Sequence, residues 1–166
     1  NNYKIPYIQM TPNNSGYRCL LMMFPAKLLY KLYRKWNTDL LMYNVRFWLT
    51  FKKTKRKHTN SDIRETLRSE RSLFLAYNNG LTAIATGIQT TEYDQKTNVG
   101  ESEVETGCAS NDMVSMGLLK YIKNFQIVNG GQTTASIFKA KEAEDKLSLN
   151  GAFVQVKLIV LSEDQN

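Results

Sequence analysis

The segment from Phe125 to Ile137 constrains the fold of this chain more than any other stretch. A short apolar run of β type is followed by the pair Gly130-Gly131 and then by hydroxyl residues that open a helical pattern. This order predicts a strand that turns sharply into a helix, with backbone N–H groups and small polar side chains pointing at whatever lies over the helix N-terminus. Such a junction often binds anions. The candidate ligand-binding residues of this motif are Asn129, Gly130, Gly131, Gln132 and Thr133.

A second Asn-Gly motif, Asn78-Asn79-Gly80, precedes an apolar run that predicts a strand over residues 81–91. An Asn-Gly pair is the standard cue for a tight turn. Two adjacent carboxamides can equally hydrogen-bond the phosphate, sugar or base edge of a ligand. Both interpretations stay open. The candidate binding residues of this motif are Asn78, Asn79, Gly80 and Thr82.

The two motifs carry a family resemblance. The block from Phe74 to Thr82, followed by the block from Gln126 to Thr133, resembles the two signature blocks of the abortive infection phage resistance (AIPR) family. Two further blocks, Asn44 to Leu49 and Asn60 to Leu67, agree in order, and the resemblance covers roughly residues 18 to 161. It implies a single domain that acts in prokaryotic antiphage defence.

The resemblance also implies a role for the first block, in which we expect Asn44 and Arg46 to contribute to a phosphate site. A lone arginine in an apolar block also commonly pairs with a carboxylate or carbonyl for structural reasons. The basic insertion at 51–58 departs from the short connection usual in the family. In the family an Asn- and Gln-rich segment follows the strand that here ends near Leu161, so we expect the chain to stop inside the complete domain.

Positive charge is concentrated in the first third of the chain. The net charge is +7, yet residues 1–58 hold twelve Lys and Arg against the single acidic residue Asp39, whereas the remainder is acidic overall. A basic segment suggests a polyanionic partner, most simply nucleic acid or a nucleotide. One run in this segment predicts a loop that is either solvated or in contact with nucleic-acid phosphates. Its cations are Lys52, Lys53, Lys55, Arg56 and Lys57.

The segment after Pro25 predicts an amphipathic helix, because Leu28, Leu29, Leu32, Tyr33 and Trp36 follow helical spacing. Its opposite face carries only cations. A solvated face and a phosphate-contacting face are both compatible with this pattern. The cations are Lys27, Lys31, Arg34 and Lys35.

Composition favours a globular, cytoplasmic protein. The hydrophobic fraction is 42%, and no apolar stretch approaches the ~20 residues of a membrane span. We therefore expect no membrane association, signal peptide or anchor. Cys19 and Cys108 form neither a metal-ligand pair nor a disulfide framework, which suggests reduced thiols.

The sequence names no catalytic residue. His58 lacks the partners of a catalytic triad, and Asn129 to Gln132 lacks the lysine and spacing of a P-loop. Glu101, Glu103 and Glu105 alternate along a predicted strand, where they would form either a solvated edge or a Mg²⁺ site. We assign no metal ligands. The cofactor is unknown, with Mg²⁺ as the candidate ion, and the oligomeric state is open.

The element order predicts an α+β fold, a small mixed β-sheet flanked by helices. The order of its later elements resembles the ParB/sulfiredoxin fold, in which a strand leads into a Gly-containing motif at a helix N-terminus. The predicted helices also include 62–69, with Ser61 as N-cap, and 133–146. The predicted strands are 3–10, 18–24, 81–91, 101–107, 125–128 and 154–161.

Three functions compete on this sequence. The leading hypothesis is a defence domain that binds a nucleotide or nucleic-acid phosphate through the Asn/Gly/Gln/Thr motifs. The second is a metal-dependent nuclease or nucleotide hydrolase that uses the same pocket. The third is a DNA-docking scaffold in which both Asn-Gly motifs are only turns. Convergence of the motifs in one place would favour the first two over the third.

Overall fold

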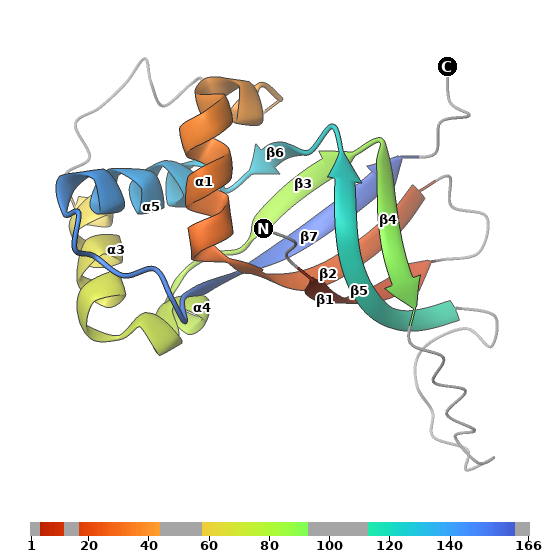
Figure 1. Cartoon of the computed structure of the whole chain (residues 1–166), viewed down its shortest axis with the longest axis horizontal. Helices are drawn as coiled ribbons and strands as arrows, with labels where there is room; N and C mark the ends of the chain where they lie inside the picture. The colour runs from red at the N-terminus through yellow and green to blue at the C-terminus, as the bar shows by residue number, and fades with distance from the viewer. Residues whose placement is uncertain (1–3, 12–16, 44–57, 93–112, 162–166) are drawn as a thin grey trace, which may run out of the picture.

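The computed structural model describes residues 4–11, 17–43, 58–92 and 113–161. Its strands form one seven-stranded sheet (Figure 1), in which β3 and β7 are parallel and every other described pairing is antiparallel. The order across the sheet is β4 (Gly87–Glu92), β5 (Met113–Lys123), β1 (Ile5–Thr11), β2 (Tyr17–Pro25), β7 (Phe153–Leu161), β3 (Leu81–Ala85) and β6 (Gln126–Asn129).

Alternation of side chains explains the central strands. In β7, alternate residues from Val154 to Val160 are buried, whereas Phe153, Gln155 and Lys157 are exposed. This is the period of two expected for a strand with one face on the core. The predicted strands at 18–24 and 154–161 are confirmed, and so is the described part of the predicted extended segment, which forms β1.

The sheet curls because one long hairpin is bent. β4 and β5 form one end of the strand order, whereas β3 and β6, which adjoin them in the chain, form the other end. The bend lies at Thr86 and Asn124, where Thr86 N donates to Lys123 O at 3.1 Å and Asn124 Nδ2 donates to Thr86 Oγ1 at 3.0 Å. Asn124 has a positive φ of 54°, which Asn tolerates better than most residues. The prediction of one uninterrupted strand over 81–91 is therefore wrong.

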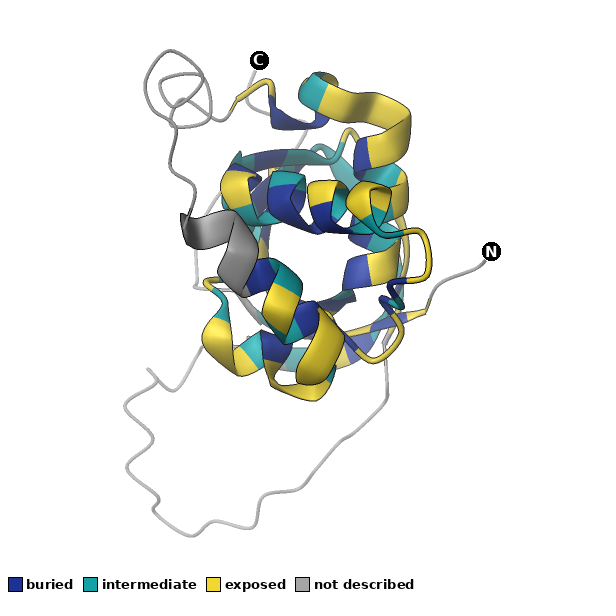
Figure 2. Ribbon diagram, turned by 90° about the vertical axis from the view of Figure 1, so that its left-hand side faces the viewer, coloured by how far each residue is buried: buried dark blue, intermediate teal, exposed yellow. Residues whose placement is uncertain are grey.

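The helices gather at one end of the curled sheet (Figures 1 and 2). α1 begins directly after Pro25 and buries Ala26, Leu29 and Tyr33, which confirms the amphipathic helix predicted there. It ends where Asn37 takes a positive φ of 47°. The helical elements are α1 (Ala26–Trp36), the 3₁₀ turn η1 (Asn37–Leu41), α3 (His58–Ser69), the 3₁₀ turn η2 (Arg71–Leu73), α4 (Phe74–Tyr77) and α5 (Gly131–Ala143).

Two predicted helix boundaries are wrong. α3 begins at His58, so Ser61 lies inside the helix and is not its N-cap. α5 begins at Gly131 rather than at Thr133, because Gly130 takes the left-handed conformation, with φ of 87°, and makes the turn itself. α5 ends at Ala143 because Glu144 is extended.

Aromatic contacts join two parts of the sheet and pack α1 against α5. Phe24 of β2 stacks on Phe125 with ring centroids 5.8 Å apart. Tyr30 and Tyr33 of α1 contact Phe138 of α5 at 5.8 and 5.1 Å between centroids. The α+β fold with a mixed sheet flanked by helices is thus confirmed, and the likeness to the ParB/sulfiredoxin fold stays a prediction. None of the described helices is long and apolar enough to cross a membrane.

Candidate functional site

The two Asn-Gly motifs lie next to each other. β3 and β6 pair antiparallel with Thr82 opposite Asn129. β3 follows Asn78-Asn79-Gly80 directly, and β6 leads directly into Gly130 and α5. The segments Asn78 to Thr82 and Asn129 to Thr133 therefore form one junction, although they are far apart in the sequence.

Gly130 packs so tightly on the other motif that only glycine fits. A Cβ at Gly130 would lie 2.3 Å from Leu81 Cδ2 and 3.1 Å from Gly80 O. Leu81 is 2% exposed, so its side chain could make room for a Cβ only by shifting against its neighbours in the core. The positive φ of Gly130 is a second reason, since residues with a Cβ are strained there.

Position 80 also needs a glycine, because its backbone lies close to β7. A Cβ at Gly80 would lie 2.9 Å from Gln155 O, a backbone atom. Both glycines therefore have structural roles.

The polar residues beside these glycines differ in exposure. Asn79, Asn129 and Gln132 are exposed, whereas Asn78, Thr82 and Thr133 are half-buried.

Hydrogen bonds orient two of the carboxamides. Asn129 Oδ1 accepts a hydrogen bond from the backbone N–H of Gly130 at 2.9 Å. This bond uses only the oxygen of the side-chain amide, so it does not engage the two N–H donors of Asn129. Asn78 Nδ2 donates to Phe74 O at 3.1 Å, and Asn78 N donates to the same carbonyl. Asn78 thus closes the C-terminal end of α4.

The start of α5 has backbone donors without a partner, although one of them belongs to Gly131, which is buried. The first backbone hydrogen bond of the helix runs from Thr134 N to Gly130 O at 3.2 Å. Gly130 is the N-cap residue, and no side-chain hydrogen bond caps the helix there. Within the described part of the chain, the N–H groups of Gly131, Gln132 and Thr133 therefore have no partner, as expected for a first helical turn. Thr134 is fully buried, and its Oγ1 donates to Gly130 O at 3.4 Å.

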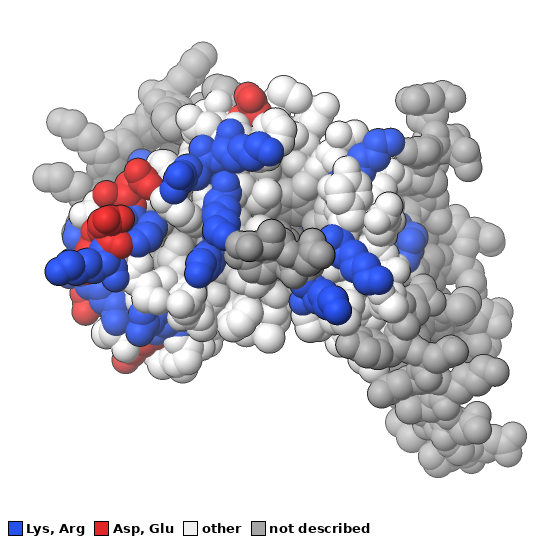
Figure 3. Space-filling model, viewed as in Figure 1, with Lys and Arg blue, Asp and Glu red and all other residues white. Residues whose placement is uncertain are grey.

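The basic face predicted for α1 is present. Lys27, Lys31, Arg34 and Lys35 are all exposed, and α1 contains no acidic residue. Figure 3 shows Lys and Arg side chains along α1, while most acidic side chains on that face lie at the end near α3. A hydrogen bond that Arg34 donates to the Tyr30 hydroxyl raises the pKa of Arg34, and Lys35 Nζ lies 4.7 Å from the centroid of the exposed Trp36 ring.

Other predicted residues lie outside the described ranges. These are Asn44, Arg46, the five loop cations Lys52, Lys53, Lys55, Arg56 and Lys57, and the alternating Glu101, Glu103 and Glu105. Within residues 4–11, 17–43, 58–92 and 113–161 there is no group of three or more His, Cys, Asp and Glu side chains placed to hold a metal ion.

A second polar cluster was not predicted from the sequence. Arg64 and Arg68 of α3 both bond the carboxylate of Glu144, which directly follows α5. Their spacing of four residues signals that the two arginines share one helix face. Nothing in the local sequence pairs them with a carboxylate so far along the chain.

Comparison with protein families finds a match to the family described as AIPR protein, over residues 41–166. The matched stretch includes both Asn-Gly motifs, α3 and α5, and it begins after β1, β2 and α1. Comparisons with curated proteins and with solved structures find no significant match. The chain therefore belongs to the AIPR family and contains an abortive-infection, antiphage-defence domain.

Proposed function

We propose that this defence domain binds a phosphate group, from a nucleotide or a nucleic acid, at the junction of the two Asn-Gly motifs. The observation that carries the proposal is the pairing of Thr82 with Asn129, together with the close packing of Gly130 on Gly80 and Leu81. These contacts hold exposed carboxamides from two separate segments beside the first turn of α5.

The donors at this junction match the chemistry of a phosphate. The N–H groups of residues 131–133 carry the partial positive charge of a helix N-terminus, which favours an anion. The amide of Asn129 adds side-chain donors, because its oxygen is already bonded to Gly130 N. Gln132 and Asn79 are exposed and add further amide groups. All of these groups are neutral, which suits a ligand whose remaining charge is neutralised elsewhere.

Cations for a larger ligand lie on α1, which packs against α5. Its exposed lysines and arginine form a row on a helix without acidic residues, and Glu142 of α5 lies near Arg34 at one point of this row. A nucleic-acid backbone contacting this row would release counterions and bind in a strongly salt-dependent way. The proposal for the partner is accordingly a nucleotide or a nucleic-acid strand, with one phosphate at the motif junction.

Thermal unfolding with added ligands tests this function. Nucleotides and short DNA and RNA strands are added to the chain with and without Mg²⁺, and a ligand of the folded state stabilises it by about 2.7 kcal/mol at a hundredfold excess over Kd. In the Gln132→Ala variant we expect near-native stability without ligand and about tenfold weaker binding, the scale of one hydrogen bond to a charged group.

The matched control is Gln89→Ala, which removes an exposed glutamine from β4, at the opposite end of the strand order from β6. It should leave both stability and affinity unchanged. If Gln132→Ala destabilises the protein while the folded fraction binds as tightly as the wild type, the motif is architectural and the proposal fails.

A further inference from the structure

A cavity of about 390 Å³ lies between α3 and α5, away from the Asn-Gly junction. Its residues on α5 begin at Ser136, five positions after the start of that helix. A helix rises about 1.5 Å per residue, so Lys139 lies about 12 Å along the axis from Gly131. The cavity is lined by Arg64, Glu65, Arg68, Ser136, Lys139, Ala140 and Ala143.

Positive charge dominates the lining. The lining contains two guanidinium groups and one ammonium group but only one acidic residue, Glu65. Within the described residues, Lys139 forms no ion pair, and Arg64 Nε is buried without a hydrogen-bond partner. A buried donor without a partner is costly and is usually satisfied by a ligand, an ion or water.

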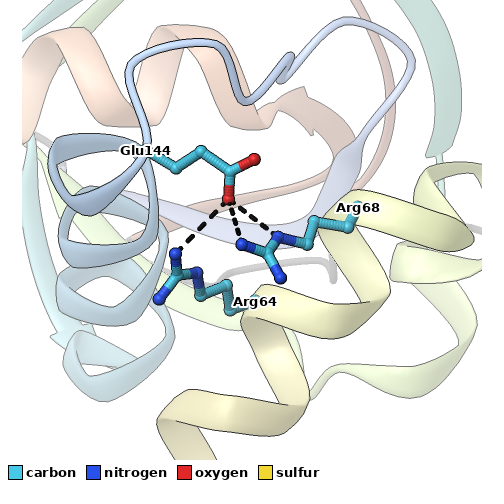
Figure 4. Close-up of polar contacts among 3 residues, drawn as sticks. All are labelled: Arg64, Arg68 and Glu144. Atoms are coloured by element: carbon cyan, nitrogen blue, oxygen red, sulfur yellow. Dashed lines mark hydrogen bonds and ion pairs between the residues drawn. The ribbon is translucent and has the colours of Figure 1, made fainter.

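The Glu144 carboxylate pairs with only some of the hydrogen-bond donors of Arg64 and Arg68 (Figure 4). Its Oε2 accepts from Arg68 Nε and Nη2 at 2.7 Å each and from Arg64 Nη2 at 3.4 Å. One carboxylate oxygen thus serves two guanidinium groups, whereas a guanidinium group is best matched by two acceptor oxygens in a fork. The Glu144 side chain is 30% exposed, so a ligand can reach the pair from solvent.

We propose that the cavity between α3 and α5 binds the phosphate group of a nucleotide-sized phosphomonoester, which replaces the Glu144 carboxylate on Arg64 and Arg68. A phosphate has three terminal oxygens and up to two negative charges, so it can satisfy both arginines at once and leave charge for Lys139. The volume lies at the lower end of the range for small-molecule pockets. The apolar Ala140 and Ala143 provide a surface for the rest of the ligand.

A purely structural clamp makes a different prediction. The arginines lie in the C-terminal half of α3, where cations complement the helix dipole, and Glu144 ties that helix to the end of α5. If this is their whole role, removal of the Glu144 charge weakens the fold and at most adds salt-screened, non-saturable attraction of anions. If Glu144 competes with a ligand, the same change strengthens binding of that ligand.

The test is isothermal titration of the 166-residue chain with AMP, with adenosine as the control ligand. We expect saturable binding of AMP and none of adenosine, about tenfold tighter binding in Glu144→Gln, and about tenfold weaker binding in Arg68→Gln, the scale of one charged contact. Arg71→Gln is the matched control, because Arg71 bonds Ser148 O outside the cavity. AMP binding that is absent, or that Glu144→Gln does not tighten, overturns the proposal.

A second variant covers the case in which Glu144→Gln or Arg68→Gln does not fold. Lys139→Gln leaves the Glu144 clamp intact and should weaken AMP binding, whereas Lys146→Gln should not; equal affinities in these two variants contradict the proposal. AMP binding in this cavity is the part that Lys139→Gln weakens, whereas any part that Gln132→Ala weakens belongs to the motif junction, which separates the two sites.

A further titration compares a 5′-phosphorylated hexanucleotide with its 5′-hydroxyl counterpart. Tighter binding of AMP than of the phosphorylated strand identifies a free mononucleotide as the source of the phosphate. The reverse order, with loss of binding by the 5′-hydroxyl strand, identifies a strand end. Equal binding of both strands, independent of Arg68, contradicts a phosphomonoester site.

Discussion

Replacing Gly130 by alanine tests the contact that joins the two motifs. The added Cβ would lie 2.3 Å from Leu81 Cδ2 and 3.1 Å from Gly80 O, at a backbone φ of 87°. The left-handed conformation costs a residue with a Cβ about 1–2 kcal/mol. Overpacking a tight contact adds about 1–3 kcal/mol. We therefore expect Gly130→Ala to lower the free energy of unfolding by about 2–5 kcal/mol.

Gly151 provides a matched control for the backbone term. Its φ of 80° is nearly the same, but nothing lies within 4 Å of a Cβ added there. Gly151→Ala should therefore cost only the conformational part, about 1–2 kcal/mol. Replacing glycine by alanine also lowers the conformational entropy of the unfolded chain, and this stabilisation is the same in both variants, so it cancels in the comparison.

Urea unfolding followed by circular dichroism measures both changes, provided the slopes of the transitions agree. The difference between the two variants isolates the packing of Gly130 on Gly80 and Leu81, and we expect it to be about 1–3 kcal/mol. If Gly130→Ala costs no more than Gly151→Ala, the two motifs are not in contact as described, and the argument for a shared site fails.

Two further predictions concern charge. The hydrogen bond from Arg68, with a smaller contribution from Arg64, lowers the pKa of Glu144. The ionised carboxylate therefore stabilises the fold at any pH above its unfolded pKa of about 4.3. This stabilisation is lost as the pH falls through the lower pKa of the folded state. Urea midpoints should therefore fall less between pH 7 and pH 3 in Glu144→Gln than in the wild type, and equal falls would contradict the ion pair. Replacing Lys52, Lys53, Lys55, Arg56 and Lys57 by serine should weaken DNA or RNA binding and reduce the log–log salt slope by roughly 0.7–0.9 per lost phosphate contact, with little loss of stability. Fluorescence anisotropy across a salt series measures this slope, and an unchanged slope would assign the run to a solvated loop.

Local periodicity was sufficient to predict several elements of the fold. The alternation in β7 and the helical spacing in α1 arise from neighbouring residues, so the sequence shows them directly. The bend at Thr86 could not be predicted in this way, because it depends on the bonds with Lys123 and Asn124 across the hairpin. Gly87, directly after the bend, was the local signal for it.

The candidate site was predictable in composition but not in detail. The shared Asn-Gly pattern marked both motifs, and the ladder between β3 and β6 brings them together. Thr133 was expected to begin α5, yet Gly130 makes that turn, since only its positive φ and missing Cβ allow the contact with Leu81. The cluster of Arg64, Arg68 and Glu144 depends on the packing of α3 on α5, which no local pattern encodes.

An amide NMR titration tests the central claim most directly, because it reports on each backbone N–H separately. The isotope-labelled chain is titrated with a nucleotide, and the account predicts saturable shifts at Gly131, Gln132 and Thr133 together with Asn79 and Gly80 across the junction. Gln132→Ala should reduce these shifts at a given ligand concentration. Shifts confined to the cavity between α3 and α5, or no saturable shift at the start of α5 with any nucleotide or short strand, would contradict the account of the motif junction as a phosphate site.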